Sequence, residues 1–138
     1  MRAQLEWSES EVTDPTTGDS RRISGQQPFE GEINFTQDLP RWNLQWGGNA
    51  FLGFEETYYR FDTVDRVELE TWYNVFAEWR ARPDLAIRLE LQNLAGRNVI
   101  RTRDVYDGPR DSSPLLFREV RDLNFDPFIY MRIRRTWG

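Results

Sequence analysis

The sequence predicts an all-β fold: an antiparallel up-and-down meander of about six long strands that is part of, or imitates, a transmembrane β-barrel. Apolar and polar residues alternate with a period of two along most of the chain, and no segment of useful length has helical periodicity. Aromatic residues make up 14% of the chain although its mean hydropathy is −0.75. A barrel in lipid accounts for both values, because one face of each strand is apolar while the other face and the loops are polar.

The first three predicted strands cover residues 2–12, 29–38 and 42–60. In each strand the apolar residues occupy one parity, which is typical of a strand with two different faces. Strand by strand, they are Ala3, Leu5 and Trp7; Ile33 and Phe35; and Trp42, Leu44, Trp46, Ala50, Leu52 and Phe54. In the third strand, Gly47, Gly48 and Gly53 predict a bend or a bulge.

The last three predicted strands cover residues 66–82, 85–104 and 115–137. Their apolar parity holds Tyr73, Val75, Ala77 and Trp79; Leu85, Ile87, Leu89 and Leu91; and Ile129, Met131, Ile133 and Trp137. The opposite parity carries charged residues on neighbouring strands, namely Glu78, Arg80, Arg88, Glu90, Arg132 and Arg134. We expect these charges to face a hydrated lumen, where they can form cross-strand ion pairs.

The connections between the predicted strands alternate in length. Residues 39–41 and 83–84 make short turns, whereas the connections at about 13–28, 56–66 and 93–116 are long and polar. Outer-membrane barrels have short periplasmic turns and longer outer loops. With a periplasmic C-terminus, both short turns fall on the periplasmic side.

Three tryptophans recur at this predicted periplasmic end. Trp42, Trp79 and Trp137 all lie on the apolar parity, which predicts an interfacial girdle that contacts the membrane lipid. The alternative is that they are ordinary core tryptophans of a soluble barrel.

Composition excludes several kinds of chemistry. The chain has no cysteine and no histidine, so it lacks thiolates, the commonest general base and the commonest metal ligand. Its net charge of −5 argues against nucleic acid as a partner. Carboxylate pairs such as Glu68 and Glu70 have no accompanying nucleophile, so we expect no enzyme activity, no cofactor and no bound metal.

Two loop features have alternative interpretations. Residues 14–18 could outline a calcium loop, but the ligand spacing of an EF-hand is missing, and Asp-Pro followed by Thr-Gly predicts a turn. Arginines on or beside the last long loop could bind an anionic substrate or lipopolysaccharide phosphates, but interleaved carboxylates predict mutual pairing instead. These arginines are Arg97, Arg101, Arg103, Arg110, Arg118 and Arg121.

Residues 11–47 resemble the late barrel strands of TonB-dependent outer-membrane receptors. The likeness lies in a loop of the form V-x-D-P-x-T-G, then R-x-I-S-G-x-x-P, then an alternating strand. The residues that carry it are Val12, Asp14, Pro15, Thr17, Gly18, Arg22, Ile23, Ser24, Gly25 and Pro28. Asn93-Leu94 resembles the end of the family's penultimate strand, and residues 128–138 resemble its terminal strand.

The resemblance implies a segment of a transporter barrel for uptake of a scarce nutrient such as an iron chelate. Its partners would be outer-membrane lipid, the remaining barrel strands, a plug domain and TonB, which contacts an N-terminal part that the chain lacks. Three features depart from the family: Trp137 replaces the terminal Phe, Arg135 lies on the apolar parity, and six strands are too few to close. We therefore expect a fragment, residues 1–138, of a larger outer-membrane protein.

Two other functions stay open at this stage. A soluble lipocalin-like barrel would point the same charges outward and bind a small apolar ligand in its centre. An excised or designed β-scaffold would have no activity.

Overall fold

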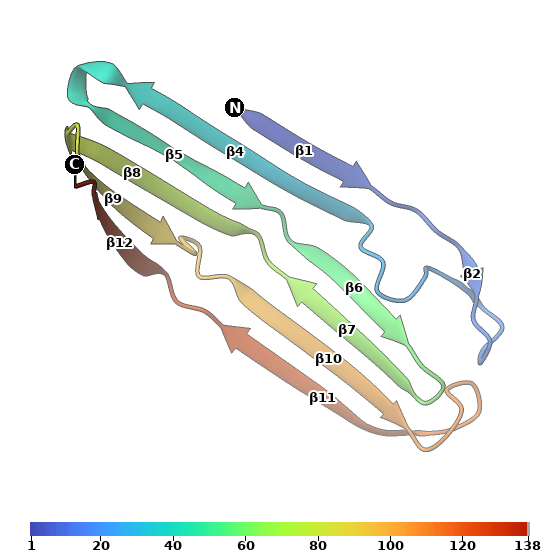
Figure 1. Ribbon diagram of the computed structural model, residues 1–138. Coiled ribbons are helices and arrows are strands. Elements are labelled where there is room, and N and C mark those ends of the chain that lie inside the picture. Colours follow the sequence, from blue (N-terminus) through green and yellow to red (C-terminus); the bar gives the residue numbers. More distant parts are fainter. Residues whose placement is uncertain (138) are drawn as a thin grey trace.

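The computed structural model describes residues 1–137 and confirms the all-β prediction (Figure 1). A six-stranded antiparallel sheet has the order β1-β4-β5-β8-β9-β12. Its strands are β1 (Arg2–Trp7), β4 (Phe29–Leu39), β5 (Leu44–Phe51), β8 (Trp72–Arg82), β9 (Leu85–Gln92) and β12 (Phe128–Arg135). The meander is open: neither this sheet nor the second one closes into a barrel.

A four-stranded antiparallel sheet continues the same strands beyond short interruptions (Figure 1). Its order is β11-β10-β7-β6, with β6 (Phe54–Tyr59), β7 (Thr63–Leu69), β10 (Asn98–Tyr106) and β11 (Leu115–Asn124). A small hairpin of β2 (Val12–Thr13) and β3 (Ser20–Arg21) lies at the same end of the molecule. Each of the long strands predicted after residue 40 is thus divided into two shorter strands, one in each sheet.

The interruption between β5 and β6 falls where the sequence predicts a bulge. A Cβ added at Gly53 would lie 2.2 Å from the carbonyl oxygen of Leu69, so only glycine allows the two backbones to approach this closely. By contrast, Gly47 and Gly48 lie inside β5, whose pairing with β4 and β8 is regular.

Three predicted boundaries are wrong. Residues 8–11 do not extend the first strand; Ser8 instead donates its backbone N–H to the carbonyl of Pro28 at 3.0 Å, where the loop begins to fold back. The predicted connections 56–66 and 93–116, which overlap the ends of the predicted strands, are shorter than expected, because much of 56–66 belongs to β6 and β7 and residues 98–106 form β10. Both faces of the strands in the four-stranded sheet carry polar residues, so the two-residue alternation that identifies a strand is weak there.

The six-stranded sheet has two chemically distinct faces. Its register aligns Trp46, Ala77, Leu89 and Met131 across four strands on what we call the apolar face. One residue along, the register aligns Gln45, Glu78, Arg88 and Arg132 on the opposite, charged face. Pairing that is regular over most of the sheet therefore sorts the whole alternating pattern into two surfaces.

The two short turns lie together at one end of the sheet. The 3-10 turn η1 (Pro40–Trp42) joins β4 to β5, and the Pro83–Asp84 turn joins β8 to β9. Thr136 donates its backbone N–H to the carbonyl of Asp84 at 2.9 Å, which places the end of β12 beside the second turn (Figure 1). The longer loops, 8–28 and 107–114, lie at the opposite end with the compact β6–β7 hairpin.

Candidate functional site

The exposure of β8 is reversed relative to a globular protein. Tyr73, Val75, Ala77 and Trp79 on the apolar face are exposed, whereas their polar or charged-face neighbours between Trp72 and Glu78 are half-buried. A soluble sheet places its apolar parity in a dry core. In this structure Val75, Leu89 and Ile133 are 40%, 45% and 60% exposed, so they do not pack together in a dry centre.

The charged face forms an ion-pair network centred on Glu78. Arg80, Arg88 and Arg134 approach its carboxylate at 3.7, 3.9 and 3.9 Å, from three different strands. Arg88 also donates from Nε to Glu90 at 2.5 Å. The structure thus brings together five of the six charged residues singled out in the sequence.

Aromatic rings extend this network. The guanidinium of Arg88 lies 3.7 Å from the ring centroid of Phe76, and that of Arg132, the sixth residue, lies 5.6 Å from the centroid of Tyr130. Both are cation–π distances. The charged face is therefore a layer of mutually paired arginine, glutamate and aromatic side chains.

The three girdle tryptophans all lie at the end of the sheet that holds the short turns. Trp42 is in η1, Trp79 pairs with Leu44 next to that turn, and Trp137 follows β12. All three are exposed, Trp42 and Trp137 by 68% and 76%. Arg135, on the apolar parity, places its guanidinium 3.9 Å from the ring centroid of Trp137 and pairs with Asp84 at 3.5 Å.

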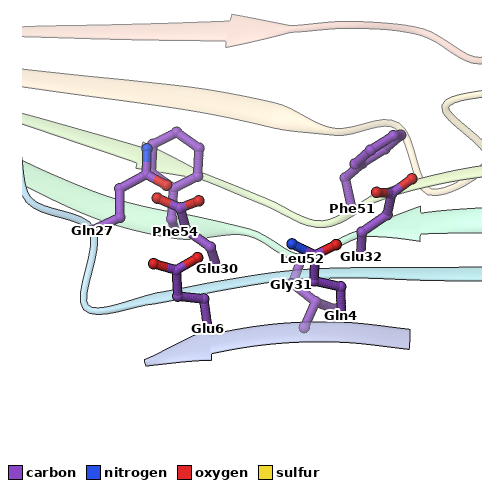
Figure 2. A pocket seen from close by; sticks show the side chains of 9 residues that line it. All are labelled: Gln4, Glu6, Gln27, Glu30, Gly31, Glu32, Phe51, Leu52 and Phe54. Atoms are coloured by element: carbon purple, nitrogen blue, oxygen red, sulfur yellow. The ribbon is translucent and has the colours of Figure 1, made fainter. Parts of the chain in front are cut away.

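A pocket of about 290 Å³ opens on the polar side of β1 and β4 (Figure 2). Glu6 and Glu30 are register partners on one side of it, and Glu32 lies beside Phe51 on the other. No basic residue lines the pocket. Its charge would attract cations or hydroxyl donors and repel anions.

The loops at the far end are joined by one buried carboxylate. Asp14 is 1% exposed and accepts hydrogen bonds from Arg21 at 2.5 Å and from Arg110 at 2.7 Å. The backbone N–H groups of Thr16 and Thr17 donate to its other oxygen at 2.8 and 3.2 Å. These bonds confirm the predicted turn, and the carboxylate has protein donors in place of a calcium ion.

Asp14 ties together three segments that are distant in sequence. Arg110 comes from the loop after β10, and both arginines lie over the ring of Tyr59 in β6, at centroid distances of 4.8 Å for Arg21 and 5.5 Å for Arg110. Burial raises the pKa of the Asp14 carboxyl, but the four hydrogen bonds more than offset this, so its pKa lies well below the ordinary 3.8. The carboxylate therefore stays ionised at neutral pH.

The remaining arginines near the last loop pair mostly with neighbouring carboxylates, as the sequence predicts. Arg101 and Arg103 both bind Asp65 of β7, and the hydrogen bond from Arg101 lowers the pKa of that buried carboxyl. Arg118 binds Asp104 with two hydrogen bonds, at 2.5 and 2.7 Å, which lowers the pKa of Asp104. Arg121 pairs with Glu119. This pairing leaves few free guanidinium groups for an external anion at this end.

Asn93 is a structural residue whose role the sequence does not reveal. It is fully buried, has a left-handed backbone with φ of 55°, and marks the end of β9. Its side-chain oxygen accepts from the N–H of Arg97 at 2.7 Å, and its amide donates to the carbonyl of Phe125. The Asn-Leu pair signals a break, but Phe125 lies 32 residues away and only the fold brings it close.

The described residues hold no group of three or more acidic, histidine or cysteine side chains placed to bind a metal ion. Across residues 1–137 there is also no helix long and apolar enough to cross a membrane. No protein-family model matches the chain, and neither a curated protein nor a solved structure shows significant similarity to it.

Proposed function

We propose that the six-stranded sheet is a wall segment of a bacterial outer-membrane β-barrel. In this assignment the apolar face contacts lipid hydrocarbon and the charged face lines a hydrated lumen. The observation that carries the proposal is the exposure pattern of β8: Tyr73, Val75, Ala77 and Trp79 on the apolar face are exposed, whereas the residues between them and Trp72, on the charged face, are half-buried. In hydrocarbon, exposed leucine, valine and tryptophan side chains become favourable.

Strand length supports the same assignment. The strands after β1 in the six-stranded sheet are 8 to 11 residues long, close to the 9–11 residues or so that a tilted strand needs to cross a bilayer. The clean division into two faces ends where the interruptions begin. The four-stranded sheet, which carries polar residues on both faces, would then rise above the membrane into water.

The open edges of β1 and β12 support a larger assembly. In the part of the chain that the structure describes, each of these strands has one neighbour only, so its outer backbone groups lack strand partners. The remaining strands of a wider barrel would pair with both edges. By resemblance, that barrel belongs to a TonB-dependent receptor, and its plug domain and TonB are further partners.

The resemblance also supplies the biological role. The intact receptor would import a scarce nutrient such as an iron chelate, and the loops joined by Asp14 would form part of the mouth. The wall segment itself has no catalytic function. The lipocalin-like alternative needs Val75, Leu89 and Ile133 in a dry centre, and their exposure favours the membrane assignment.

The first test is the behaviour of the purified chain with and without detergent. We expect the chain to aggregate in plain buffer and to be dispersed by non-ionic detergent, because its apolar face has no protein cover. A monodisperse monomer in plain buffer would refute the assignment. Binding of a fatty acid by that monomer would favour a lipocalin-like protein, and no binding would favour an inactive scaffold.

The second test measures the depth of the tryptophans in the parent barrel. We expect lipids brominated near the headgroup to quench Trp42, Trp79 and Trp137 more strongly than lipids brominated near the chain end. The substitutions Trp42→Arg and Trp79→Arg should hinder bilayer insertion of the parent barrel. Unchanged insertion of both variants would contradict the prediction that these tryptophans form an interfacial girdle.

A further inference from the structure

A second pocket, of about 630 Å³, lies on the charged face at the end with the short turns. Three arginines line it, Arg80 and Arg82 from β8 and Arg134 from β12. Asn43, Asp84 and Thr136 contribute to the same wall. This pocket is chemically opposite to the acidic one beside β1.

The pocket has more positive charge than its carboxylates can balance. Arg80 and Arg134 share the single carboxylate of Glu78, which also faces Arg88, and every one of these contacts is 3.7 Å or longer. Asp84 is paired with Arg135 at 3.5 Å. Among the described residues, Arg82 has no carboxylate within ion-pair distance. Most arginines at the other end are closely paired, so this excess is local.

The backbone around the pocket is fixed. The N–H of Arg80 donates to the carbonyl of Asn43 at 2.8 Å, and the N–H of Thr136 donates to Asp84 at 2.9 Å. The first of these bonds links β8 to the η1 turn, and the second links the end of β12 to the β8–β9 turn. The three arginines are therefore anchored on a rigid frame while their guanidinium groups stay accessible.

Three accessible guanidinium groups suit a tetrahedral anion. Each guanidinium presents several N–H donors in a planar fork, and a phosphate offers oxygens in several directions at once, whereas a carboxylate offers only two oxygens in one plane. We propose that this pocket binds a phosphate group. That group could belong to a soluble phosphate ester or to a lipid headgroup at the rim of the sheet.

The test titrates the detergent-solubilised full chain with inorganic phosphate and pyrophosphate at low ionic strength, using calorimetry. We expect saturable binding, tighter for pyrophosphate, which the double substitution R82Q/R134Q weakens about tenfold or more. The control is R118Q/R121Q, which removes the same charge from exposed side chains of β11 at the other end. Both doubles alter accessible side chains, so far-UV circular dichroism should show unchanged folding.

Two results would overturn the proposal: no saturable binding of any phosphate probe, or equal weakening by both double substitutions, which would indicate charge attraction alone. A parallel titration compares vesicles of phosphatidylcholine with and without phosphatidylglycerol. Loss of binding by R82Q/R134Q only with the phosphatidylglycerol vesicles assigns the phosphate to a lipid headgroup, and loss only with free phosphate assigns it to a soluble ester. The phosphate proposal is independent of the membrane assignment. If the chain proves to be monodisperse without detergent, the membrane assignment fails, but the arginines still line the pocket and the same titration applies.

Discussion

β7 and β8 are consecutive parts of one strand run, yet they differ in kind. From Trp72 to Trp79, β8 alternates half-buried charged-face residues with exposed apolar-face residues, whereas β7 mixes Val64, Asp65, Arg66 and Val67 without a clear apolar face. The difference extends to the sheets they belong to. Alternation in β8 indicates that its two faces meet different surroundings. The weaker alternation in β7, which precedes Glu70, is expected where both faces of a strand meet water or other loops.

The two regions also differ in what holds them together. The six-stranded sheet has a shared ion-pair network with contacts mostly longer than 3.5 Å around Glu78. The loops and the four-stranded sheet depend on close, buried carboxylate–arginine bonds at Asp14 and Asp65. A single substitution should therefore affect mainly the region in which it lies, and the size of its effect on stability should differ between the two regions.

The largest effect is expected from Asp14→Ala. Removing this carboxylate leaves the largely buried Arg21 and Arg110 without a carboxylate partner, which typically costs about 3–5 kcal/mol. We expect the 8–28 loop to detach from β6 and the 107–114 loop, while the six-stranded sheet is unchanged. Faster hydrogen exchange confined to the amides of both loops would show this; unchanged exchange at Thr16 and Thr17 would contradict it.

Next in size is Leu89→Arg, on the apolar face. A charge facing hydrocarbon near the bilayer midplane costs about 2–4 kcal/mol in a barrel. Val120→Arg is the matched control, because Val120 is also exposed but belongs to the four-stranded sheet. Urea unfolding of the parent barrel in lipid vesicles should be shifted by the first substitution and not by the second. Equal shifts would mean that the two sheets meet the same medium.

Acid should loosen the loop end of the molecule. The pKa values of Asp14, Asp65 and Asp104 are lowered in the folded chain. Their stabilisation is therefore complete above the ordinary value of 3.8 and is lost as the pH falls below it towards the lowered folded values. Hydrogen exchange, corrected for intrinsic rates, should show that the amides around these carboxylates are less protected at pH 3 than at pH 6. Unchanged protection around these carboxylates at pH 3 would contradict the prediction.

The smallest effect is expected from Arg118→Gln. The pair with Asp104 has good geometry, but the arginine side chain is 58% exposed and solvent screens its charge, so its loss should change stability very little. The urea midpoint of the chain should barely move, and high salt should mask the difference. If Arg118→Gln lowered the stability as much as Asp14→Ala does, the difference in solvent exposure between these two ion pairs would not explain their contributions.

The predictive power of the sequence follows the same division. It gives β4 almost its full bounds and places β8, β9 and β12 within longer predicted strands, because strict alternation marks them. The predicted strands 42–60, 66–82, 85–104 and 115–137 also contain β6, β11 and most of β7 and β10, but apart from the bulge near Gly53 they run through the breaks that divide the chain into two sheets. Of the candidate charges, Glu78, Arg80, Arg88, Glu90 and Arg134 do meet, since they share a face on adjacent strands.

Local alternation is enough to tell which residues share a face, because a strand repeats every two residues and this pattern needs no information from elsewhere in the chain. Contacts between distant segments are visible only in the folded chain: Asp14 meets Arg110, 96 residues away, and Asn93 bonds to Phe125. The pocket shared by Arg80, Arg82 and Arg134 is another example. Such contacts depend on strand register and on how loops fold back over sheet ends. Those are set by the balance of many distant interactions, which no local pattern records.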